Sequence, residues 1–203
     1  MYKYLALLLV AIVIFISFNK ERSYVSKLNK TDTILTFGDS ITYGFGANNY
    51  ESYPYILSQL TDKKVLNAGV NGDTSAQGVQ RLSSLLENDS IKLILLCFGG
   101  NDIIQKQPLS ELKSNLKKMI QMAKAKNINV ILISVPNLSL FGLDSLDLYD
   151  EIAEEEDVEL IKGLLAHVLS KSSLKSDYIH PNSKGYRYIA DEIYKHLKSN
   201  KWI

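Results

Sequence analysis

The sequence holds a single cysteine, Cys97, among 203 residues. One cysteine excludes an intrachain disulfide and any metal site built from several cysteines. Because Cys97 stands inside the apolar run 91–98, we expect a small buried residue of a central strand rather than a reactive thiol. The three histidines, His167, His180 and His196, lack the spacing of a metal-binding pair. We therefore expect chemistry that needs neither a metal nor a cofactor.

Excess charge of either sign is also lacking. The 23 basic residues nearly balance the 22 acidic ones, and the formal net charge is +1. Such a chain has no field that would steer it onto nucleic acid, so we expect no nucleic-acid partner. The length suits one domain with a well-filled core. The composition leaves the oligomeric state open.

Long apolar runs are missing except near the start, at residues 4–18. Fifteen helical residues span about 22 Å, short of the roughly 30 Å hydrocarbon core, so the run fits the apolar region of a secretory signal. No A-x-A-like site or lipobox cysteine follows it, and an uncleaved membrane anchor stays open. In either case we expect export to the periplasm or another extracytoplasmic compartment, with residues 1–30 as signal or anchor and 31–203 as the domain.

From Thr33 onward, short apolar runs alternate with amphipathic stretches. Near-continuous apolar runs are typical of strands buried on both faces, as in a parallel sheet. The alternation predicts a three-layer α/β/α sandwich with a mostly parallel five-stranded sheet. The predicted strands are 34–37, 64–70, 91–98 and 129–135, with a weaker fifth at 158–161. The predicted helices are 52–60, 74–86, 109–126 and 183–198.

Four polar, mostly Gly-rich segments lie at the predicted strand ends or just before the last helix. Ligands of open parallel sheets bind at the carboxyl ends of the strands. Each segment alone is often a plain turn or a helix cap. All four in order favour an active site. They are Gly-Asp-Ser at 38–40, Asn-Ala-Gly-Val-Asn-Gly-Asp-Thr at 67–74, Gly-Gly-Asn-Asp at 99–102 and Asp-Tyr-Ile-His-Pro at 177–181.

Ser40 is the candidate nucleophile of this site. A serine hydroxyl attacks well only when a base removes its proton, and a histidine held by a carboxylate can do so near neutral pH. Asp177 and His180 are three residues apart, the spacing at which side chains on one helical turn face the same way. We therefore predict His180 as the base and Asp177 as its orienting group. No G-x-S-x-G elbow occurs, which disfavours an α/β-hydrolase.

The tetrahedral intermediate of acyl transfer also needs donors for its oxyanion, each worth about 3–4 kcal/mol. Gly72 offers a backbone N–H that a ligand can approach closely. Asn101 offers a side-chain amide from a tight turn, and the backbone N–H of Ser40 completes the predicted set.

Together these segments resemble the GDSL, or SGNH, hydrolase family. The first family motif stands here as Phe-Gly-Asp-Ser-Ile-Thr at 37–42, and the resemblance extends from about Thr33 to the last helix. The chain looks most similar to the bacterial acyl esterase branch, with its thioesterases, lysophospholipases and arylesterases. The resemblance implies a flavodoxin-like sandwich and family roles for Ser40, Gly72, Asn101, Asp177 and His180. The stretch 136–149 departs from the family pattern, which leaves substrate specificity open.

Apolar side chains next to the predicted site suggest an acyl-binding surface, although packing as a small satellite core is equally open. They are Ile103, Ile104, Leu138, Leu140, Phe141, Leu143, Leu146 and Leu148. As a groove they predict that Ile103, Leu138 and Phe141 bind an acyl chain of about six carbons or more.

The leading interpretation is a serine esterase that hydrolyses ester or thioester bonds of acyl or lipid substrates through an acyl-enzyme on Ser40. The alternative is an O-acetylesterase of cell-envelope carbohydrate. A third hypothesis, from another class, is a non-enzymatic envelope protein that binds a glycan or lipid. The complete Ser, Gly, Asn, Asp and His set disfavours that hypothesis, because a binding protein needs no base and orienting carboxylate.

Overall fold

The computed structural model of the chain describes residues 27–137, 143 and 146–203. The run 4–18, with its predicted signal or anchor role, lies outside these residues, as do Leu138, Leu140 and Phe141. Within the described part of the chain, no helix combines the length and the apolar character needed to cross a bilayer.

Five parallel strands form one sheet in the order β2-β1-β3-β4-β5. This confirms the predicted sheet, including the weaker fifth strand. The central strands β1 and β3 are buried along almost their whole length, because helices cover both faces of the sheet. The strands are β1 (Thr33–Gly38), β2 (Lys64–Gly69), β3 (Ile91–Cys97), β4 (Asn129–Ile133) and β5 (Glu159–Ile161).

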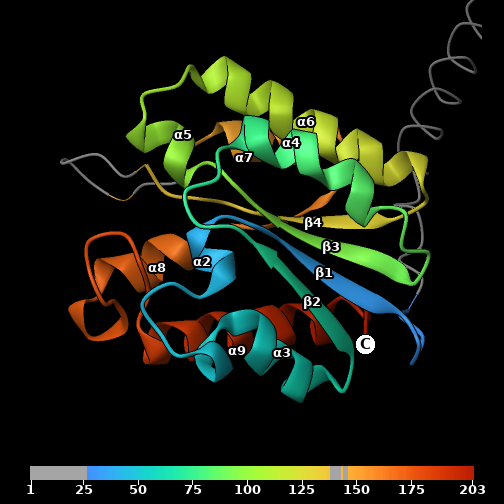
Figure 1. The fold of residues 1–203 in the computed structure, drawn as a ribbon, viewed down its shortest axis with the longest axis horizontal. Helices are drawn as coiled ribbons and strands as arrows, with labels where there is room; N and C mark the ends of the chain where they lie inside the picture. The colour runs from blue at the N-terminus through green and yellow to red at the C-terminus, as the bar shows by residue number, and fades with distance from the viewer. Residues whose placement is uncertain (1–26, 138–142, 144–145) are drawn as a thin grey trace, which may run out of the picture.

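Helices cover the two faces of the sheet, as predicted for a three-layer sandwich (Figure 1). One layer holds α4 (Ser75–Leu85), α5 (Gly100–Ile104), α6 (Leu109–Ala125) and α7 (Leu148–Glu155). The other holds α2 (Ser40–Tyr43), α3 (Tyr53–Thr61), α8 (Leu164–Ser170) and α9 (Ser183–Ser199). The 3₁₀ turns η1 (Asn49–Glu51) and η2 (Ser172–Leu174) lie in the connections. The four predicted helices correspond to α3, α4, α6 and α9.

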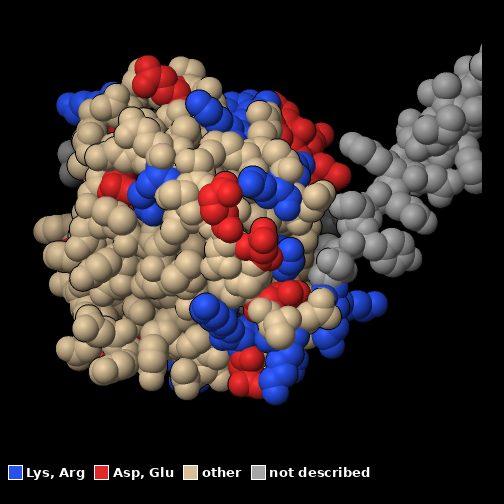
Figure 2. Space-filling view, turned by 45° about the vertical axis from the view of Figure 1, so that its right-hand side comes forward, with Lys and Arg blue, Asp and Glu red and all other residues tan. Residues whose placement is uncertain are grey.

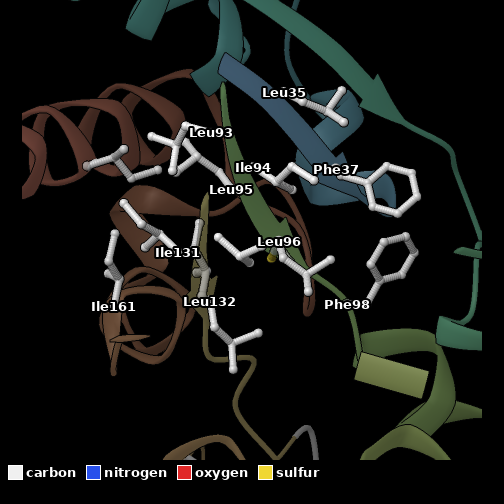
Figure 3. Packing of buried hydrophobic residues seen from close by; sticks show 14 of the residues in the cluster. Leu35, Phe37, Leu93, Ile94, Leu95, Leu96, Phe98, Ile131, Leu132 and Ile161 are labelled. Atoms are coloured by element: carbon white, nitrogen blue, oxygen red, sulfur yellow. The ribbon is translucent and has the colours of Figure 1, made fainter. Parts of the chain in front are cut away.

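Apolar side chains of the strands fill the space between the layers. Figure 3 shows the ring of Phe37, on β1, facing that of Phe98, just beyond the end of β3. The rings of Phe37 and Phe98 meet edge to face at 5.1 Å. Each such side chain stabilises the fold by about 1.5–3 kcal/mol when fully buried. The core therefore holds the central strands rigidly up to their carboxyl ends.

Cys97 is buried at the end of β3, as predicted. Burial, with the nearby charge of Asp39, raises the pKa of its thiol well above the usual value. The thiolate is thus scarce, and Cys97 acts as a small core residue.

Residues 146–149, the described end of the stretch 136–149, pack onto the domain. Leu148 is buried and begins α7, and Leu146 packs against the core. Leu148 and Ile152 lie one helical turn apart on the buried side of α7, together with Tyr149. Of the two alternatives left open by the sequence, packing therefore holds for Leu146 and Leu148.

The strand register places three polar segments side by side. Gly38, the last residue of β1, pairs with Gly69 of β2 on one side and with Cys97 of β3 on the other. The residues that follow these strands therefore start from one edge of the sheet, the one formed by the carboxyl ends of its strands. This edge carries α2 and α5 and lies at the left in Figure 1, away from the start of β1.

Candidate active site

Ser40 is the first residue of α2, directly after β1 and one capping residue. The carboxylate of Asp39 accepts the Ile41 N–H at 3.0 Å and caps this short helix. The turn is tight, because a Cβ at Gly38 would collide with Thr42 and with the Cys97 carbonyl. The sequence Gly-Asp-Ser thus fixes the Ser40 side chain at the edge of the sheet.

The structure brings Ser40, His180 and Asp177 into one hydrogen-bonded relay. The Ser40 Oγ lies 2.9 Å from His180 Nε2, and His180 Nδ1 lies 2.8 Å from Asp177 Oδ2. This is the order that base activation of a serine requires, with the carboxylate fixing the imidazole tautomer. Three residues chosen from the sequence alone thus meet across 140 positions of the chain.

The path by which Asp177 meets His180 differs from the helical turn that the spacing suggested. Residues 176–179 form a bend, and η2 ends before them, at Leu174. The second oxygen of Asp177, Oδ1, accepts the N–H groups of Ile179 at 2.8 Å and His180 at 2.9 Å. The side chain folds its own backbone into a turn, as Asp residues commonly do. The prediction of a helical turn is wrong, but Asp177 and His180 still pair through this bend.

The electrostatics of Asp177 favour its charged form. Partial burial raises its pKa, but hydrogen bonds from the His180 ring and from the Ile179 and His180 amides outweigh that effect. The net pKa of Asp177 lies below the ordinary value, so the group is a carboxylate at neutral pH. A permanent negative charge beside His180 would stabilise an imidazolium formed there if His180 took a proton from Ser40.

Phe45 is a site residue that the sequence did not reveal. Its ring centroid lies 4.5 Å from that of His180. Its backbone is held by a bond from its own N–H to the Ser40 carbonyl at 3.0 Å and by one from the Tyr186 hydroxyl at 2.7 Å. The Phe45 ring therefore packs against the imidazole that bonds Ser40 and Asp177. The position follows from contacts between distant segments, and no local motif marks it.

The two predicted oxyanion residues lie in linked turns. Gly72 has φ of +82°, a conformation that side chains rarely adopt, and it is exposed. Asn101 stands in the first turn of α5, and one of its amide hydrogens bonds the Asp73 carbonyl at 2.9 Å. An amide carries two N–H donors, so the second can serve an oxyanion. The chain thus ties Asn101 to the residue that follows Gly72.

Of the predicted acyl-binding residues, the described part of the structure includes Ile103, on α5 two residues after Asn101. Ile103 is half-buried, and its neighbour Ile104 is exposed. The other histidines have partners elsewhere: His167 stacks on Tyr188, and His196 Nε2 lies 2.6 Å from a carboxylate oxygen of Glu159. Among the described residues, no three His, Cys, Asp or Glu side chains gather as metal ligands.

Asp39 carries the most unusual carboxyl group of the site. Burial raises its pKa, the Ile41 N–H bond lowers it, and the charges of Asp102 and Asp73 raise it further, to about 7. The folded protein therefore binds this proton more tightly than the unfolded chain between about pH 4 and pH 7. The free energy of unfolding falls as the pH rises through this window.

We expect Asp39→Asn to stabilise the fold most at and above neutral pH. Asn remains neutral and can still accept the Ile41 N–H, so the variant avoids the cost of a buried charge. The gain over wild type should be smallest near pH 4 and grow up to about pH 7, reaching at most about 4 kcal/mol. Urea unfolding at a series of pH values measures it, with Asp89→Asn as the exposed control. A gain independent of pH would contradict the prediction.

Comparisons with known proteins agree with this geometry. Residues 36–188 match the model of the GDSL-like lipase/acylhydrolase family. An arylesterase from Vibrio mimicus is 31% identical over 181 residues, which cover 82% of this chain and 90% of that protein. Thioesterase 1/protease 1/lysophospholipase L1 from Escherichia coli strain K12 is 30% identical over 174 residues, 82% of this chain and 84% of that protein.

A solved structure extends the likeness to three dimensions. The psychrotrophic esterase EstA from Pseudoalteromonas sp., inhibited by monoethylphosphonate, superimposes with a TM-score of 0.73 at 26% identity. The match covers 83% of this chain and 97% of that one.

Proposed function

The chain belongs to the GDSL-like lipase/acylhydrolase family and is an ester hydrolase, and we propose that it works through an acyl-enzyme on Ser40. The observation that carries the proposal is the relay from Ser40 through His180 to Asp177, with both bonds under 3 Å. The predicted donors Gly72 and Asn101 lie on turns that start from the same sheet edge.

In the proposed reaction His180 moves every proton. Its Nε2 takes the proton of the Ser40 hydroxyl while Oγ attacks the ester carbonyl carbon. The oxyanion of the tetrahedral intermediate accepts N–H bonds from Ser40, Gly72 and Asn101. The bond to the alcohol then breaks, and the alcohol leaves with the proton from His180. Water, deprotonated by His180, attacks the carbonyl carbon of the acyl-enzyme. The bond from that carbon to Oγ then breaks, Oγ takes the proton back from His180, and the acid is released.

We propose acyl esters of about six carbons or more as substrates. Exposed apolar side chains stand on the segments that carry the catalytic groups: Phe45 beyond α2, Val70 beside the Gly72 turn and Ile104 after Asn101. Apolar surface at these points would bind an acyl chain and leave the ester at Ser40. Such chains occur in thioesters and lysophospholipids and also in simple esters.

Hydrolysis of nitrophenyl esters from acetyl to palmitoyl tests this substrate class. Burying one methylene is worth about 0.8 kcal/mol, so kcat/KM should rise by up to about fourfold per carbon until the surface is filled. Ile104→Asn and Phe141→Ala should lower the hexanoyl-to-acetyl ratio of kcat/KM. The acetyl ester serves as the control within each variant. Turnover of acetyl esters alone would favour the deacetylase instead.

One observation favours that second candidate, an O-acetylesterase of carbohydrate. Residues 40–61, next to the nucleophile, include only one charged residue, Glu51, but exposed Tyr43, Tyr50 and Tyr55. On this side of the molecule, at the lower left of Figure 2, the surface is largely free of charged side chains. Tyrosine offers a flat apolar face with a polar tip, which suits a neutral polyhydroxyl ligand.

We also propose that the protein is exported and that the run 4–18 serves as its signal or anchor. The support is the apolar character and length of the run. Leu28, near the start of the described domain, donates its N–H to the Trp202 carbonyl at 2.8 Å, and β1 begins shortly after it. An anchor would thus join the domain at the sheet edge away from Ser40. Fractionation of cells between membrane and soluble extracts tests the anchor.

A further inference from the structure

Arg81 of α4 donates hydrogen bonds to three separate segments of the chain next to the proposed site. Its Nε donates to Asp73 Oδ2 at 2.6 Å, its Nη1 to the Ala68 carbonyl at 2.8 Å and its Nη2 to the Gly38 carbonyl at 2.8 Å. Gly38 stands two residues before Ser40, and Asp73 directly follows Gly72. One side chain therefore joins the nucleophile turn to the turn of a predicted oxyanion donor.

The surroundings of Arg81 leave its guanidinium little freedom. The side chain of Arg81 is 24% exposed and that of Asp73 9% exposed. The guanidinium carbon lies 4.3 Å from the ring centroid of Phe37 and 5.7 Å from that of Phe98. A planar group with several fixed N–H directions fits this arrangement of three acceptors, whereas a lysine ammonium does not.

Asp73 extends the link to the second oxyanion residue. Its carboxylate accepts from Arg81, and its backbone carbonyl accepts from the Asn101 side chain at 2.9 Å. Movement of the Asp73 segment would therefore displace both Gly72 and Asn101. The Arg81 bond to Gly38 sets this segment relative to Ser40.

We propose that Arg81 is a positioning residue, whose guanidinium fixes the separation between the Ser40 nucleophile and the oxyanion donors Gly72 and Asn101. This inference rests on the proposed function of those residues. Oxyanion donors act at hydrogen-bond distance from the transition state and contribute little to the bound substrate. Loss of Arg81 should thus lower kcat and leave KM nearly unchanged.

The test compares Arg81→Met, Arg81→Lys and the reference Asn101→Ala on one nitrophenyl ester. We expect Arg81→Met to lower kcat by about 30-fold or more with KM within about threefold, and Arg81→Lys to lower it by about 10-fold. Asn101→Ala should lower kcat by roughly 100-fold. Arg187→Met is the matched control, because Arg187 is exposed and its ion pair is with Asp191 on the same helix. It should keep wild-type kcat.

The double variant Arg81→Met with Asn101→Ala distinguishes a positioning role of Arg81 from a general loss of stability. If Arg81 acts through the oxyanion donors, the two losses in kcat overlap and their product exceeds the loss in the double variant. Multiplying losses would overturn the inference, as would wild-type kcat in folded Arg81→Met or a change confined to KM. Failure of even Arg81→Lys to fold would also overturn it, by making Arg81 a residue of the fold. An inactive wild type would instead defeat the proposed function.

Discussion

Replacing Ser40 by alanine should lower ester hydrolysis by about four orders of magnitude or more. The substitution removes the atom that forms the covalent bond to the acyl group, and its 2.9 Å partner His180 then has no hydroxyl to activate. The side chain is small and lies at the edge of the sheet, so the fold should persist. Initial rates on a nitrophenyl ester give kcat, and circular dichroism checks the fold.

Ser58→Ala is the matched control for this variant. The Ser58 hydroxyl bonds the Tyr55 carbonyl within its own helix, so its loss should leave kcat unchanged. Hydrolysis at more than about a hundredth of the wild-type rate by pure Ser40→Ala would contradict the nucleophile assignment, because binding and oxyanion donors alone sustain far less.

Loss of the His180 imidazole should be nearly as damaging, because no other group of the relay can take the Ser40 proton. We expect His180→Ala to lower kcat by about 10⁴-fold, with KM little changed. Full activity in a folded His180→Ala variant would exclude His180 as the base. His167→Ala is the control, since that ring stacks on Tyr188 and should leave kcat unchanged.

Asp177→Asn should lower kcat less than His180→Ala does. An asparagine oxygen can still accept the Ile179 and His180 amides, so the bend that places the imidazole survives. What is lost is the negative charge beside His180 Nδ1 and the preferred tautomer. Rates of the two variants, measured side by side across neutral pH, test this order. An Asp177→Asn variant as slow as His180→Ala would make the carboxylate as necessary as the base.

The sheet could be predicted because burial on both faces leaves a strong mark on sequence. Runs such as 91–98 are apolar at almost every position, and the structure places them in central strands. The long helices also show, since Leu112, Leu116 and Met119 repeat at helical spacing and are all buried. Such patterns depend on each segment alone.

Short helices escaped prediction because their sequences read as turns. α5 begins at Gly100 and has five residues, too few for a periodic stripe. α7 begins at Leu148, inside a stretch whose apolar residues looked like a binding loop. For both, packing onto the rest of the domain decides the structure, and local propensity does not.

The residues of the site also fall into those that the sequence predicts and those that it does not. That Ser40, Asp177 and His180 would meet could be predicted, because a base-activated serine requires these residue types together and each stands in one of the four polar segments. Phe45 and Arg81 could not, because their roles depend on contacts with residues 135 and 43 positions away in the chain, His180 and Gly38. Composition and spacing carry no trace of such contacts.

The most direct test of the account is the position of a covalent adduct. The wild-type protein is treated with a fluorophosphonate, digested and mapped by mass spectrometry. A reactive serine forms a stable bond from its oxygen to phosphorus, with loss of fluoride, in place of the bond to the acyl carbon. We predict one adduct per chain, on Ser40, and none on Ser40→Ala. An adduct on another residue that forms as the enzyme loses activity, with Ser40 unmodified, would contradict the assignment of Ser40 as nucleophile.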